Sequence, residues 1–311
     1  MSNSKRKKIL LVALGGNALI NKKEQGTIAQ QFKNLRVPVR QLARLAEQYT
    51  IIITHGNGPQ VGNLMLQQEH CKSVPGLPLE ILVAQTQGQI GYMIESTLDS
   101  ELMKLDRHHR LHLVSLISYV VVDENDPAFT RPTKPIGPCF TREQAQNLPY
   151  PVHQTAKGYR RVVASPAPIT IVEKREIKRL VEQDFIVICC GGGGIPVTRE
   201  KRTFTGVDAV IDKDLASVCL AMEVGVNIFL IATDVPGAAL NFAKPGQRFL
   251  RKVTAARAQS YLAAGHFEAG SMAPKMEAAI KFRQHGGERA IICSITDIDS
   301  AIKGTAGTEI T

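Results

Sequence analysis

Six short apolar runs recur along the chain, and amphipathic segments separate them. Each run is rich in Val, Ile or Leu and is apolar on both faces; the six lie at residues 9–14, 50–54, 113–122, 185–190, 227–232 and 290–294. Runs of this kind between helical patterns are typical of a buried parallel sheet, because strands covered by helices on both faces need no polar side. The pattern therefore predicts an α/β fold with a mainly parallel sheet.

Several of the intervening helices have recognisable ends. Thr27 and Gln30 have the spacing of a capping box, and the helix that they open is expected to run toward Tyr49 with a kink at Pro38. Two more helices are expected to begin at prolines that follow small-residue turns, Pro59 and Pro274. In one further segment, residues at helical spacing end at a glycine; these are Leu215, Val218, Cys219, Met222 and Gly225.

The stretch 124–168 interrupts this rhythm. It contains eight of the sixteen prolines, short polar segments and no long periodic run. Because proline removes a backbone donor, such a segment supplies neither central strands nor long helices. We expect an inserted lid or subdomain that rises from the sheet, and a disordered linker is the alternative.

The composition is that of an ordinary packed protein with an excess of positive charge. The 311 residues provide for two domains or for one large α/β layer structure with an insertion, and the net charge is +10. Such a charge suits nucleic acid, an acidic surface or small anionic substrates. Aromatic residues are only 5%, Trp is absent, and basic residues alternate with acidic ones along the predicted helices. Small anions are therefore favoured over nucleic acid.

Cysteine spacing and hydropathy bear on the location of the protein. The six cysteines form no C-x-x-C pair and no histidine stands at ligand spacing from them, which indicates a reducing cytosol and no zinc site. The longest apolar stretch, 112–122, is interrupted by serines and a tyrosine, and the stretch 9–14 after basic residues 5–8 is too short for a signal peptide. We expect a cytoplasmic protein that binds no membrane.

Glycine-rich turns are expected at the ends of four strands, at residues 15–17, 55–58, 191–194 and 270–272. Glycine lets backbone N–H groups approach a ligand, and where the turn opens a helix the free amides and the helix dipole favour an anion. Such turns meet at one edge of a parallel sheet. No glycine is followed by lysine, and Gly56-x-Gly58-x-x-x-Gly62 misses the dinucleotide fingerprint by one residue. A P-loop ATPase and a nicotinamide enzyme are therefore disfavoured.

Three lysines occupy unusual positions for a cation. Lys134 lies in the proline-rich stretch, whereas Lys213 and Lys275 lie at expected helix N-termini, where the dipole disfavours positive charge unless an anion offsets it. Phosphoryl transfer between two anions requires such positive groups, since little covalent chemistry is left to the protein. Asp214 can orient the ammonium groups of Lys213 and Lys275, and its alternative role is a helix N-cap. For each lysine the alternative is a solvated surface charge.

Seven motifs stand in order along nearly the whole chain: ALGGNAL (13–19), THGNGPQVG (54–62), DPAFTRPTKPIG (126–137), GYRRVV (158–163), GGGGIP (191–196), GVDAVIDKD (206–214) and GSMAPK (270–275). Together they resemble the carbamate kinases of the amino-acid kinase family, and the Pro-Thr-Lys-Pro segment is the most discriminating. The resemblance implies a homodimer and a three-layer αβα sandwich around a mainly parallel twisted sheet, with a small protruding subdomain. It implies one kinase domain over 1–311, with the protruding lid at 124–168, the carbamate part mainly at 8–184 and the nucleotide part mainly at 185–311.

The resemblance also assigns roles to residues. Those expected to hold carbamate or carbamoyl phosphate are Gly15, Gly16, Asn17, Gly56, Asn57, Gly58, Gly192 and Gly193. Those expected to line the nucleotide are Thr233, Asp234, Val235, Ala239, Gly270, Ser271, Met272 and Lys275. The implied catalytic residues are Lys134, which reaches down from the lid, Lys213 and Lys275, which neutralise charge, and Asp214, which positions them. Mg²⁺ is implied with the nucleotide, held by phosphates and water and not by a protein metal site.

The implied reaction is ATP + carbamate = ADP + carbamoyl phosphate. Because carbamoyl phosphate is a mixed anhydride with high transfer potential, we expect the reaction to run in the direction of ATP synthesis, in arginine deiminase-type catabolism. Relatives that phosphorylate N-acetylglutamate carry a lysine where this chain has Asn17, and Lys134 replaces that charge. Two alternatives stay open: a kinase for another small carboxylate or phosphate acceptor, and a catalytically weak nucleotide-binding homologue. Pro236 and Ala239, which depart from the family pattern, favour the latter.

Overall fold

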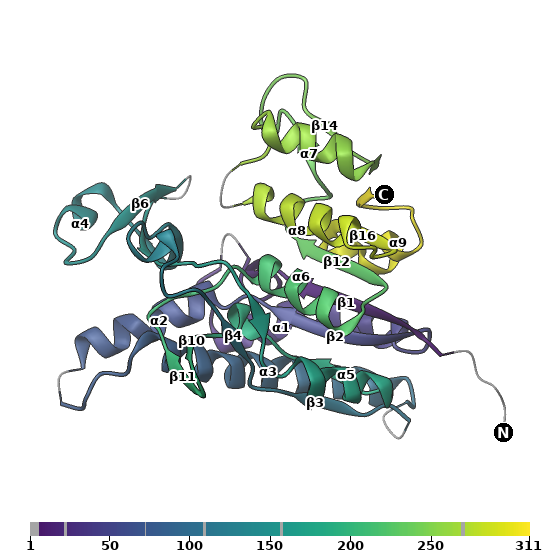
Figure 1. Ribbon diagram of the computed structural model, residues 1–311, viewed down its shortest axis with the longest axis horizontal. Coiled ribbons are helices and arrows are strands. Elements are labelled where there is room, and N and C mark those ends of the chain that lie inside the picture. Colours follow the sequence, from purple (N-terminus) through teal and green to yellow (C-terminus); the bar gives the residue numbers. More distant parts are fainter. Residues whose placement is uncertain (1–5, 22–23, 72, 108–109, 156–157, 269–270) are drawn as a thin grey trace.

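An eight-stranded sheet runs through the computed structural model, which describes residues 6–21, 24–71, 73–107, 110–155, 158–268 and 271–311 (Figure 1). Neighbouring strands are parallel except β16 and β17. In spatial order the strands are β15 (Lys252–Val253), β17 (Thr308–Ile310), β16 (Arg289–Ser294), β12 (Ile228–Thr233), β1 (Lys8–Leu14), β2 (Tyr49–His55), β9 (Ile186–Ile188) and β3 (Leu113–Ser115). The mainly parallel sheet expected from the apolar runs is confirmed.

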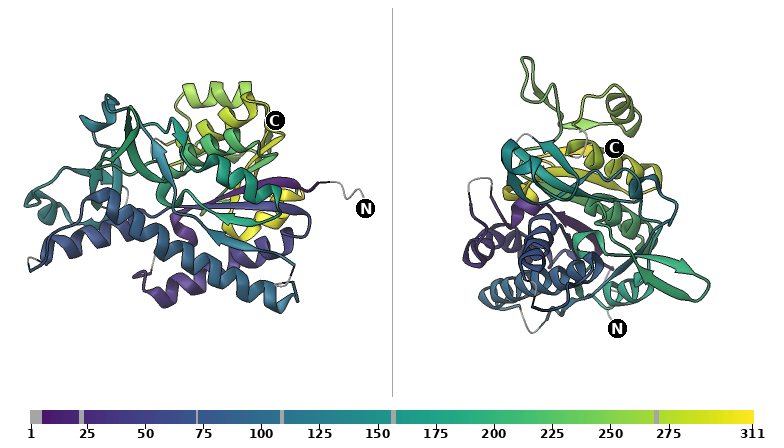
Figure 2. Two further views of the ribbon diagram at one scale, coloured as in Figure 1. Left: turned by 60° about the horizontal axis from the view of Figure 1, so that its bottom comes forward. Right: turned by 90° about the vertical axis from the view of Figure 1, so that its left-hand side faces the viewer.

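Helices cover both faces of this sheet, as the views in Figures 1 and 2 show. One face carries α1 (Ile28–Leu45), α3 (Leu79–Lys104) and α9 (Ile298–Ile302). The other carries α5 (Lys174–Glu182), α6 (Lys213–Val224), α7 (Ala255–Ala263) and α8 (Met272–Gln284). Successive residues of β1 point alternately to the two layers, because side chains alternate along a strand: Leu10 and Val12 pack with α1 and α3, whereas Leu11 and Ala13 pack with α6 and α8. The three-layer αβα sandwich is thus confirmed.

The apolar run 113–122 does not form the single strand that its hydropathy predicts. It divides into β3 and β4 (Tyr119–Val121), and β4 belongs to a second sheet with β8 (Thr170–Ile171), β10 (Ile195–Glu200) and β11 (Thr203–Gly206). The break lies at Ser118, whose N–H donates to Gln87 Oε1 at 2.9 Å and whose carbonyl accepts from Gln87 Nε2 at 3.1 Å. The pairing with β9 ends at Ser115, and the Ser118 carbonyl also accepts from the N–H of Ile195 at 2.8 Å, where the pairing of β4 with β10 begins.

The proline-rich stretch rises away from the main sheet between β4 and β8. Its described residues contain a three-stranded antiparallel sheet, whose central strand is β7, and short helical turns. These elements are η2 (Pro127–Phe129), β5 (Lys134–Phe140), α4 (Arg142–Gln146), β6 (Val152–Thr155) and β7 (Gly158–Val163). Figure 1 shows this lid projecting beside α2 (Gly58–His70), at a distance from the C-terminal elements β14 and α7.

The remaining short elements connect these parts. They are η1 (Gly16–Ala18), η3 (Gly191–Gly193), β13 (Ala239–Leu240), β14 (Arg248–Phe249) and η4 (Ile295–Asp297). The first two contain predicted glycine turns, after β1 and β9 respectively. β13 and β14 pair with each other in an antiparallel ribbon beside α7.

The predicted helix ends are mostly confirmed. Thr27 and Gln30 form the capping box, and α1 continues through Pro38 but ends at Leu45, because Tyr49 already begins β2. The end of α6 is confirmed, since Gly225 caps it in the left-handed region at φ +80°. Pro59 is the second residue of α2 and not the first, because Gly58 already begins that helix. Pro274 is the third residue of α8 and not the first, since that helix begins two residues earlier. None of the helices in the described ranges has the length and apolar character needed to cross a membrane.

Candidate active site

The carboxyl ends of β1, β2 and β12 meet at one edge of the main sheet, where the first two glycine turns lie. Gly15 follows β1, and its N–H donates to Ala232 O at 2.9 Å. Gly56 follows β2, and its N–H donates to Leu14 O at 3.1 Å. Both N–H groups therefore extend the hydrogen-bond ladders of the sheet by one residue beyond β1 and β2. A Cβ on Gly56 would lie 3.5 Å from Lys213 Cδ, so the bare glycine lets that lysine pass close to the turn.

Free backbone donors at this edge come from Gly16 and Gly58, the first residues of η1 and α2. Neither N–H has a protein acceptor within the residues that the structure describes. The two turns touch, because a Cβ on Gly16 would lie 4.0 Å from Pro59 Cδ, and Asn17 follows as the middle residue of η1. Unpaired N–H groups at the start of a helix are suited to an anion.

The glycine loop after β9 packs beneath these turns. Gly192 and Gly193 have φ values of +65° and +90° and are buried. A Cβ on Gly192 would lie 2.2 Å from Asn57 Nδ2, and one on Gly193 would lie 2.6 Å from Ile211 O. Only glycine fits this conformation and this spacing. The loop thereby brings the turn after β2 against the residue that precedes Asp212.

Charged residues begin α6. Asp212 is its N-cap, and Asp212 Oδ1 accepts from the N–H groups of Asp214 at 2.9 Å and Leu215 at 3.4 Å. The Asp214 carboxylate accepts from Lys213 Nζ at Oδ1 and from Lys275 Nζ at Oδ2, the latter at 3.0 Å. The cap role considered for Asp214 thus belongs to Asp212, and Asp214 lies between two ammonium groups.

The third lysine reaches the same place from the lid. Lys134 is the first residue of β5, and its Nζ donates to Asp212 Oδ2 at 2.6 Å. The ammonium groups of Lys134, Lys213 and Lys275 therefore come from β5, α6 and α8, and they lie on two carboxylates that are two residues apart. The three lysine side chains are between 10% and 26% exposed, so the cluster is largely shielded from water.

A chain of short hydrogen bonds fixes the first turn of α6 to the main sheet. Thr54 Oγ1 and Ser217 Oγ are 2.6 Å apart, and Ser217 Oγ donates to Lys213 O at 2.5 Å. All three residues are buried. The position of Lys213 relative to the end of β2 is therefore set by buried hydrogen bonds, whose loss is costly in an apolar environment.

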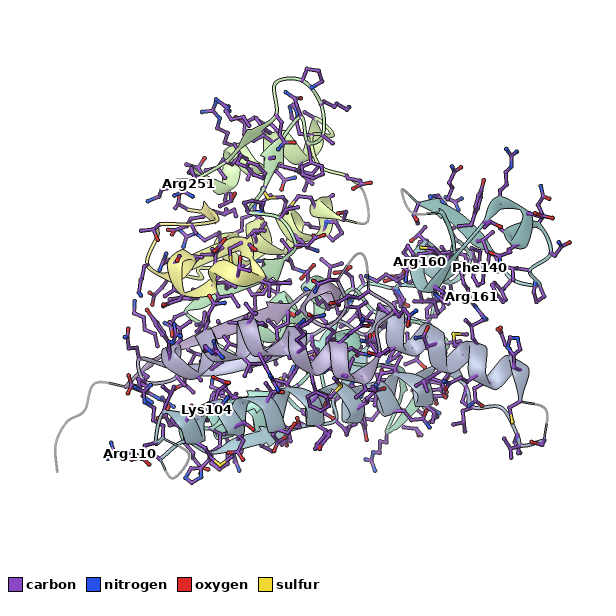
Figure 3. All side chains as sticks on the ribbon, turned by 180° about the vertical axis from the view of Figure 1, so that it is seen from behind. Lys104, Arg110, Phe140, Arg160, Arg161 and Arg251 are labelled. Atoms are coloured by element: carbon purple, nitrogen blue, oxygen red, sulfur yellow. The ribbon has the colours of Figure 1, made fainter. Side chains whose placement is uncertain are left out.

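The lid contacts α2 through two glycines. A Cβ on Gly62 would lie 2.0 Å from both the N and the Cα of Gly137, so the backbones of α2 and β5 are in direct contact. Arg160 Nε and Nη2 donate to Gly137 O at 3.0 Å and 2.7 Å. Figure 3 labels Arg160 and Arg161 in the lid above α2. The contact fixes the height of β5, and hence of Lys134, above the sheet edge.

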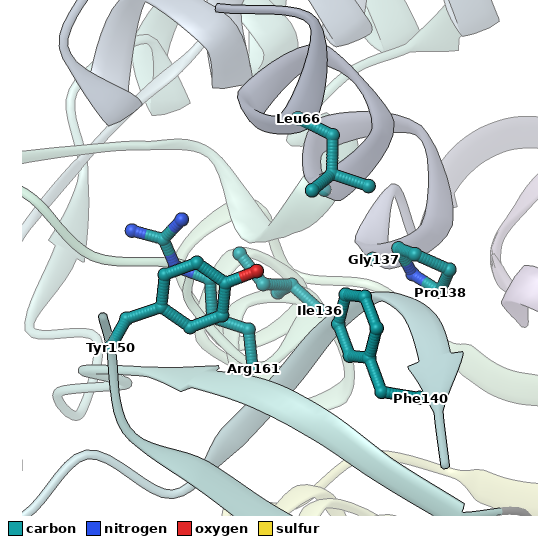
Figure 4. Close-up of a pocket in the computed structure, with 8 residues that line it drawn as sticks. Leu66, Ile136, Gly137, Pro138, Phe140, Tyr150 and Arg161 are labelled. Carbon is teal, nitrogen blue, oxygen red and sulfur yellow. The ribbon is translucent and has the colours of Figure 1, made fainter. Parts of the chain in front are cut away.

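A small pocket beside this contact is shown in Figure 4. It lies between α2 and the lid, and its lining residues are Gly62, Leu66, Ile136, Gly137, Pro138, Phe140, Tyr150 and Arg161. The Arg161 guanidinium lies 4.1 Å from the centre of the Tyr150 ring and forms an ion pair with Glu69 of α2. The lid is thus held to α2 by an ion pair as well as by the glycine contact.

Comparisons with known proteins agree with this geometry. Residues 8–294 match the family model described as the amino acid kinase family. The carbamate kinase of Thermococcus kodakarensis is 45% identical, over 97% of this chain and 99% of its own length. Structures of Giardia lamblia carbamate kinase bound to citric acid and to AMP-PNP superpose with TM-scores of 0.92 and 0.89; each is 38% identical, and each alignment covers 98% of both chains.

The chain belongs to the carbamate kinases of the amino acid kinase family. Its membership rests on nearly full-length similarity in both sequence and structure, and it makes the protein a phosphotransferase.

Burial and mutual charge shift the pKa values in the lysine–aspartate cluster of this carbamate kinase family member. Burial lowers the pKa of Lys213, and Asp214 offsets only part of this effect. Burial also opposes the charge on Lys275, but the carboxylates of Asp214 and Asp212 outweigh it and raise its pKa. Both aspartates lose solvation, yet the nearby lysines hold the pKa of each carboxyl below its usual range. Three cations and two anions leave a net charge of +1 to meet an anionic ligand.

The residues that family resemblance assigns to the nucleotide lie on the C-terminal side of this cluster. Thr233 ends β12, and the charge of Asp234, the next residue, contributes to the raised pKa of Lys275. Ser271 is the N-cap of α8 and Met272 is its first residue, whereas Gly270 lies outside the described residues. Other members of the set lie further along the chain: Val235 is half-buried and Ala239 is buried in β13.

One predicted strand is wrong here. The turn 270–272 was expected to follow a strand, but the described element before it is the helix α7, which Thr254 caps through the N–H of Arg257. The segment Ala-Ala-Arg-Ala at 255–258 has no strand-like alternation and consists of strong helix formers. The described part of the turn leads into α8, whose Lys275 reaches Asp214 at the sheet edge.

Sequence reasoning missed the role of Asp212. The residue occurs in the Asp-Lys-Asp motif, but the sequence analysis assigns catalytic roles only to its neighbours Lys213 and Asp214. The available signal was its position immediately before a helix, which is typical of an N-cap. Its ion pair with Lys134 joins residues 78 positions apart, and no local pattern predicts such a contact.

His55 provides a prediction of pH-dependent stability. The ring is 2% exposed, and burial lowers its pKa to about 4, with the Lys213 charge adding to the effect. The folded protein therefore keeps the His55 ring neutral. The contribution of the neutral ring to stability is complete above the unfolded pKa near 6.5 and is lost as the pH falls toward 4. We expect the His55→Gln variant to lose less stability than the parent protein between pH 7.5 and pH 4.5, by roughly 2 kcal/mol.

Urea unfolding at the two pH values measures this difference. The other titratable groups change the free energy of unfolding by the same amount in both proteins, so the difference between the two proteins isolates His55. Equal losses in the two proteins would contradict a neutral, buried histidine.

Proposed function

We propose that this chain catalyses reversible phosphoryl transfer between ATP and carbamate, with carbamoyl phosphate and ADP as the other pair. The observation that carries the proposal is the meeting of three ammonium groups, from Lys134, Lys213 and Lys275, with the free amides of Gly16 and Gly58 at one sheet edge. Both substrates are anions, and the transferring phosphoryl group has negative charge on all its outer oxygens. Fixed positive groups lower the barrier because they need no reorganisation during the reaction.

Residues at different places in the site have different proposed roles. Carbamoyl phosphate would bind at the turns that contain Gly15, Gly56 and Asn57, below the lid. In the direction of ATP formation, an oxygen of the ADP terminal phosphate attacks phosphorus, and the bond from phosphorus to the carbamate oxygen breaks. The charge on each side of this equation is equal, so no protein group has to accept a proton. The lysines therefore act as charge stabilisers, and Asp214 positions Lys213 and Lys275.

The nucleotide would lie on the side of Thr233, Asp234 and the start of α8. Val235, Ala239 and Gly270 to Met272 belong to the same proposed surface. Lys275 then serves both substrates, because its ammonium group bonds Asp214 and the charge of Asp234 also acts on its pKa. The lid would close over the pair and exclude water, which carbamate and carbamoyl phosphate both require.

A magnesium ion fits this arrangement as a companion of the nucleotide. Among the residues that the structure describes, no three His, Cys, Asp or Glu side chains are grouped to hold a metal ion. The carboxylates of Asp212 and Asp214 are both engaged by lysines. Magnesium would therefore take its ligands from phosphates and water, and when bound it supplies charge neutralisation between the phosphates.

We place the enzyme in the cytoplasm, as a homodimer that makes ATP from carbamoyl phosphate during arginine degradation. The direction follows from the high transfer potential of a mixed anhydride. A second copy has a suitable face on α3, where Ile81, Tyr92 and Met103 recur every eleven residues and are 41%, 65% and 50% exposed. We infer that this row of apolar side chains contributes to the contact between the two copies.

A coupled assay tests the proposed reaction. ADP and magnesium are mixed with carbamoyl phosphate, and ATP formation is followed through hexokinase and glucose-6-phosphate dehydrogenase. The matched control replaces carbamoyl phosphate by acetyl phosphate, which has the same anhydride and lacks the amino group. We expect turnover with carbamoyl phosphate and at most a small rate with acetyl phosphate. Equal rates would favour a kinase for other small carboxylates, and no turnover with either would favour a nucleotide-binding homologue.

A further inference from the structure

Two carboxylates, and not one, organise the lysines of the site. Asp214 contacts Lys213 and Lys275, whereas Asp212 contacts Lys134 through Oδ2 at 2.6 Å. The Asp212 side chain is 16% exposed and that of Lys134 is 26% exposed, so the ion pair is partly shielded from water. Charged pairs in such surroundings interact more strongly than pairs on an open surface.

The two oxygens of Asp212 have different tasks. Oδ1 caps α6 by accepting from the N–H groups of Asp214 and Leu215, and this bond sets the direction of the carboxylate. Oδ2 is then left facing the lid, where Lys134 Nζ occupies it. The helix cap and the lid lysine are therefore coupled through one rigid side chain.

The backbone of the lid has other described attachments. The Gly62–Gly137 contact and the Arg161–Glu69 ion pair join it to α2, and Ala164 O accepts from the N–H of Val210, two residues before Asp212, at 3.0 Å. These contacts fix the lid backbone but do not direct the ammonium group at the end of the long Lys134 side chain. A lysine has four rotatable side-chain bonds, and holding its ammonium group in one place requires a specific partner.

We propose that Asp212 is a positioning residue for the phosphoryl transfer: it seats the lid lysine Lys134 above the start of α6, as Asp214 seats Lys213 and Lys275. The inference rests on the proposed function and deepens it, because it assigns to the same site a second organising carboxylate. It also explains how three lysines from separate elements come together, since each has a carboxylate partner.

The alternative is that Asp212 serves only as a helix cap. The Asp212→Asn variant separates the two roles, because asparagine is an equally good N-cap and its side-chain oxygen can still accept from Asp214 and Leu215. The variant loses the negative charge that Lys134 contacts. Asp212→Ala loses both the cap and the charge.

The experiment is a double-mutant cycle on kcat, measured as ATP formation from ADP and carbamoyl phosphate. It compares the parent enzyme, Asp212→Asn, Lys134→Gln and the double variant. We expect Asp212→Asn to lower kcat by roughly 10- to 100-fold, since misplacing a catalytic group by about 1 Å costs on this order. The double variant is expected to be no slower than Lys134→Gln alone, because residues that act as a unit are not additive.

Two further readouts exclude a merely structural effect. The KM for ADP is expected to stay unchanged in Asp212→Asn, because the nucleotide side of the site keeps Lys275 and Asp214. The melting temperature is expected to stay unchanged in Asp212→Asn and to fall in Asp212→Ala. As a matched control, Asp208→Asn changes another aspartate that accepts a helix N–H, from Leu79 at 3.0 Å, and we expect its kcat to equal that of the parent.

The outcomes separate this inference from the proposed function. If the parent enzyme makes no ATP from carbamoyl phosphate, the proposed function fails, and a positioning role in that phosphoryl transfer fails with it. If the parent is active and Asp212→Asn retains its kcat, or if the effects of Asp212→Asn and Lys134→Gln multiply independently, the positioning role of Asp212 is wrong.

Discussion

Gly62→Ala is expected to lower kcat by roughly 100-fold, although replacing glycine by alanine inside a helix normally stabilises it. The new Cβ would lie 2.0 Å from the backbone of Gly137, and neither backbone can move without displacing its element. We expect the lid to lift away from α2, which withdraws Lys134 from Asp212. The melting temperature is expected to fall as well, because overpacking a tight contact costs about 1–3 kcal/mol.

The matched control is Gly76→Ala, in the loop that follows α2. A Cβ there would meet no heavy atom within 4 Å. We expect its kcat and melting temperature to equal those of the parent enzyme. Limited proteolysis measures the lid directly: the Gly62→Ala lid is expected to be cut faster. A Gly62→Ala enzyme with normal kcat and normal proteolysis would show that the lid is not held at this contact.

Lys213→Ala is expected to lower kcat by roughly 10²–10³-fold, the scale for losing one preorganised charge stabiliser. The side chain is 10% exposed, and its ammonium group bonds Asp214 beside the turn after β2. Lys275→Ala is expected to cause a loss of the same order, because its ammonium group occupies the other oxygen of Asp214. The coupled assay measures both, with circular dichroism to verify folding.

The control for the lysine series is Lys303→Ala. That side chain is 67% exposed and pairs with Asp299 one helical turn away, an arrangement that contributes little. We expect it to retain full kcat. A Lys213→Ala or Lys275→Ala enzyme that also retains full kcat would remove that residue from the mechanism.

The layer architecture could be predicted from the sequence because it depends on local periodicity. A run such as 227–232 is apolar on both faces only if helices cover both sides of the sheet, and the structure has this arrangement at β12. The division at Ser118 could not be predicted, because it depends on Gln87 of α3, which lies 31 residues earlier. Periodicity does not register a hydrogen bond between separate elements.

The candidate site could be predicted in part from the types of residue that it contains. Lys213 and Lys275 were identified because a cation at a helix start needs an anion, and the structure places both on Asp214. Their catalytic roles, and those of the other candidate residues, stay predictions. Asp212 was missed because its partner Lys134 lies in the lid, and the approach of the lid depends on the two glycines that allow close contact.

The place at which the lid enters the chain has a consequence for how such enzymes can be altered. The chain leaves the second sheet at β4 and returns at β8, and Val121 pairs with Thr170 across neighbouring strands, which are about 4.8 Å apart. A graft at these two points would need no long linker, so the lid can be removed or replaced as one contiguous segment. Such a replacement would change Lys134 and leave the glycine turns of the main sheet with their own sequence.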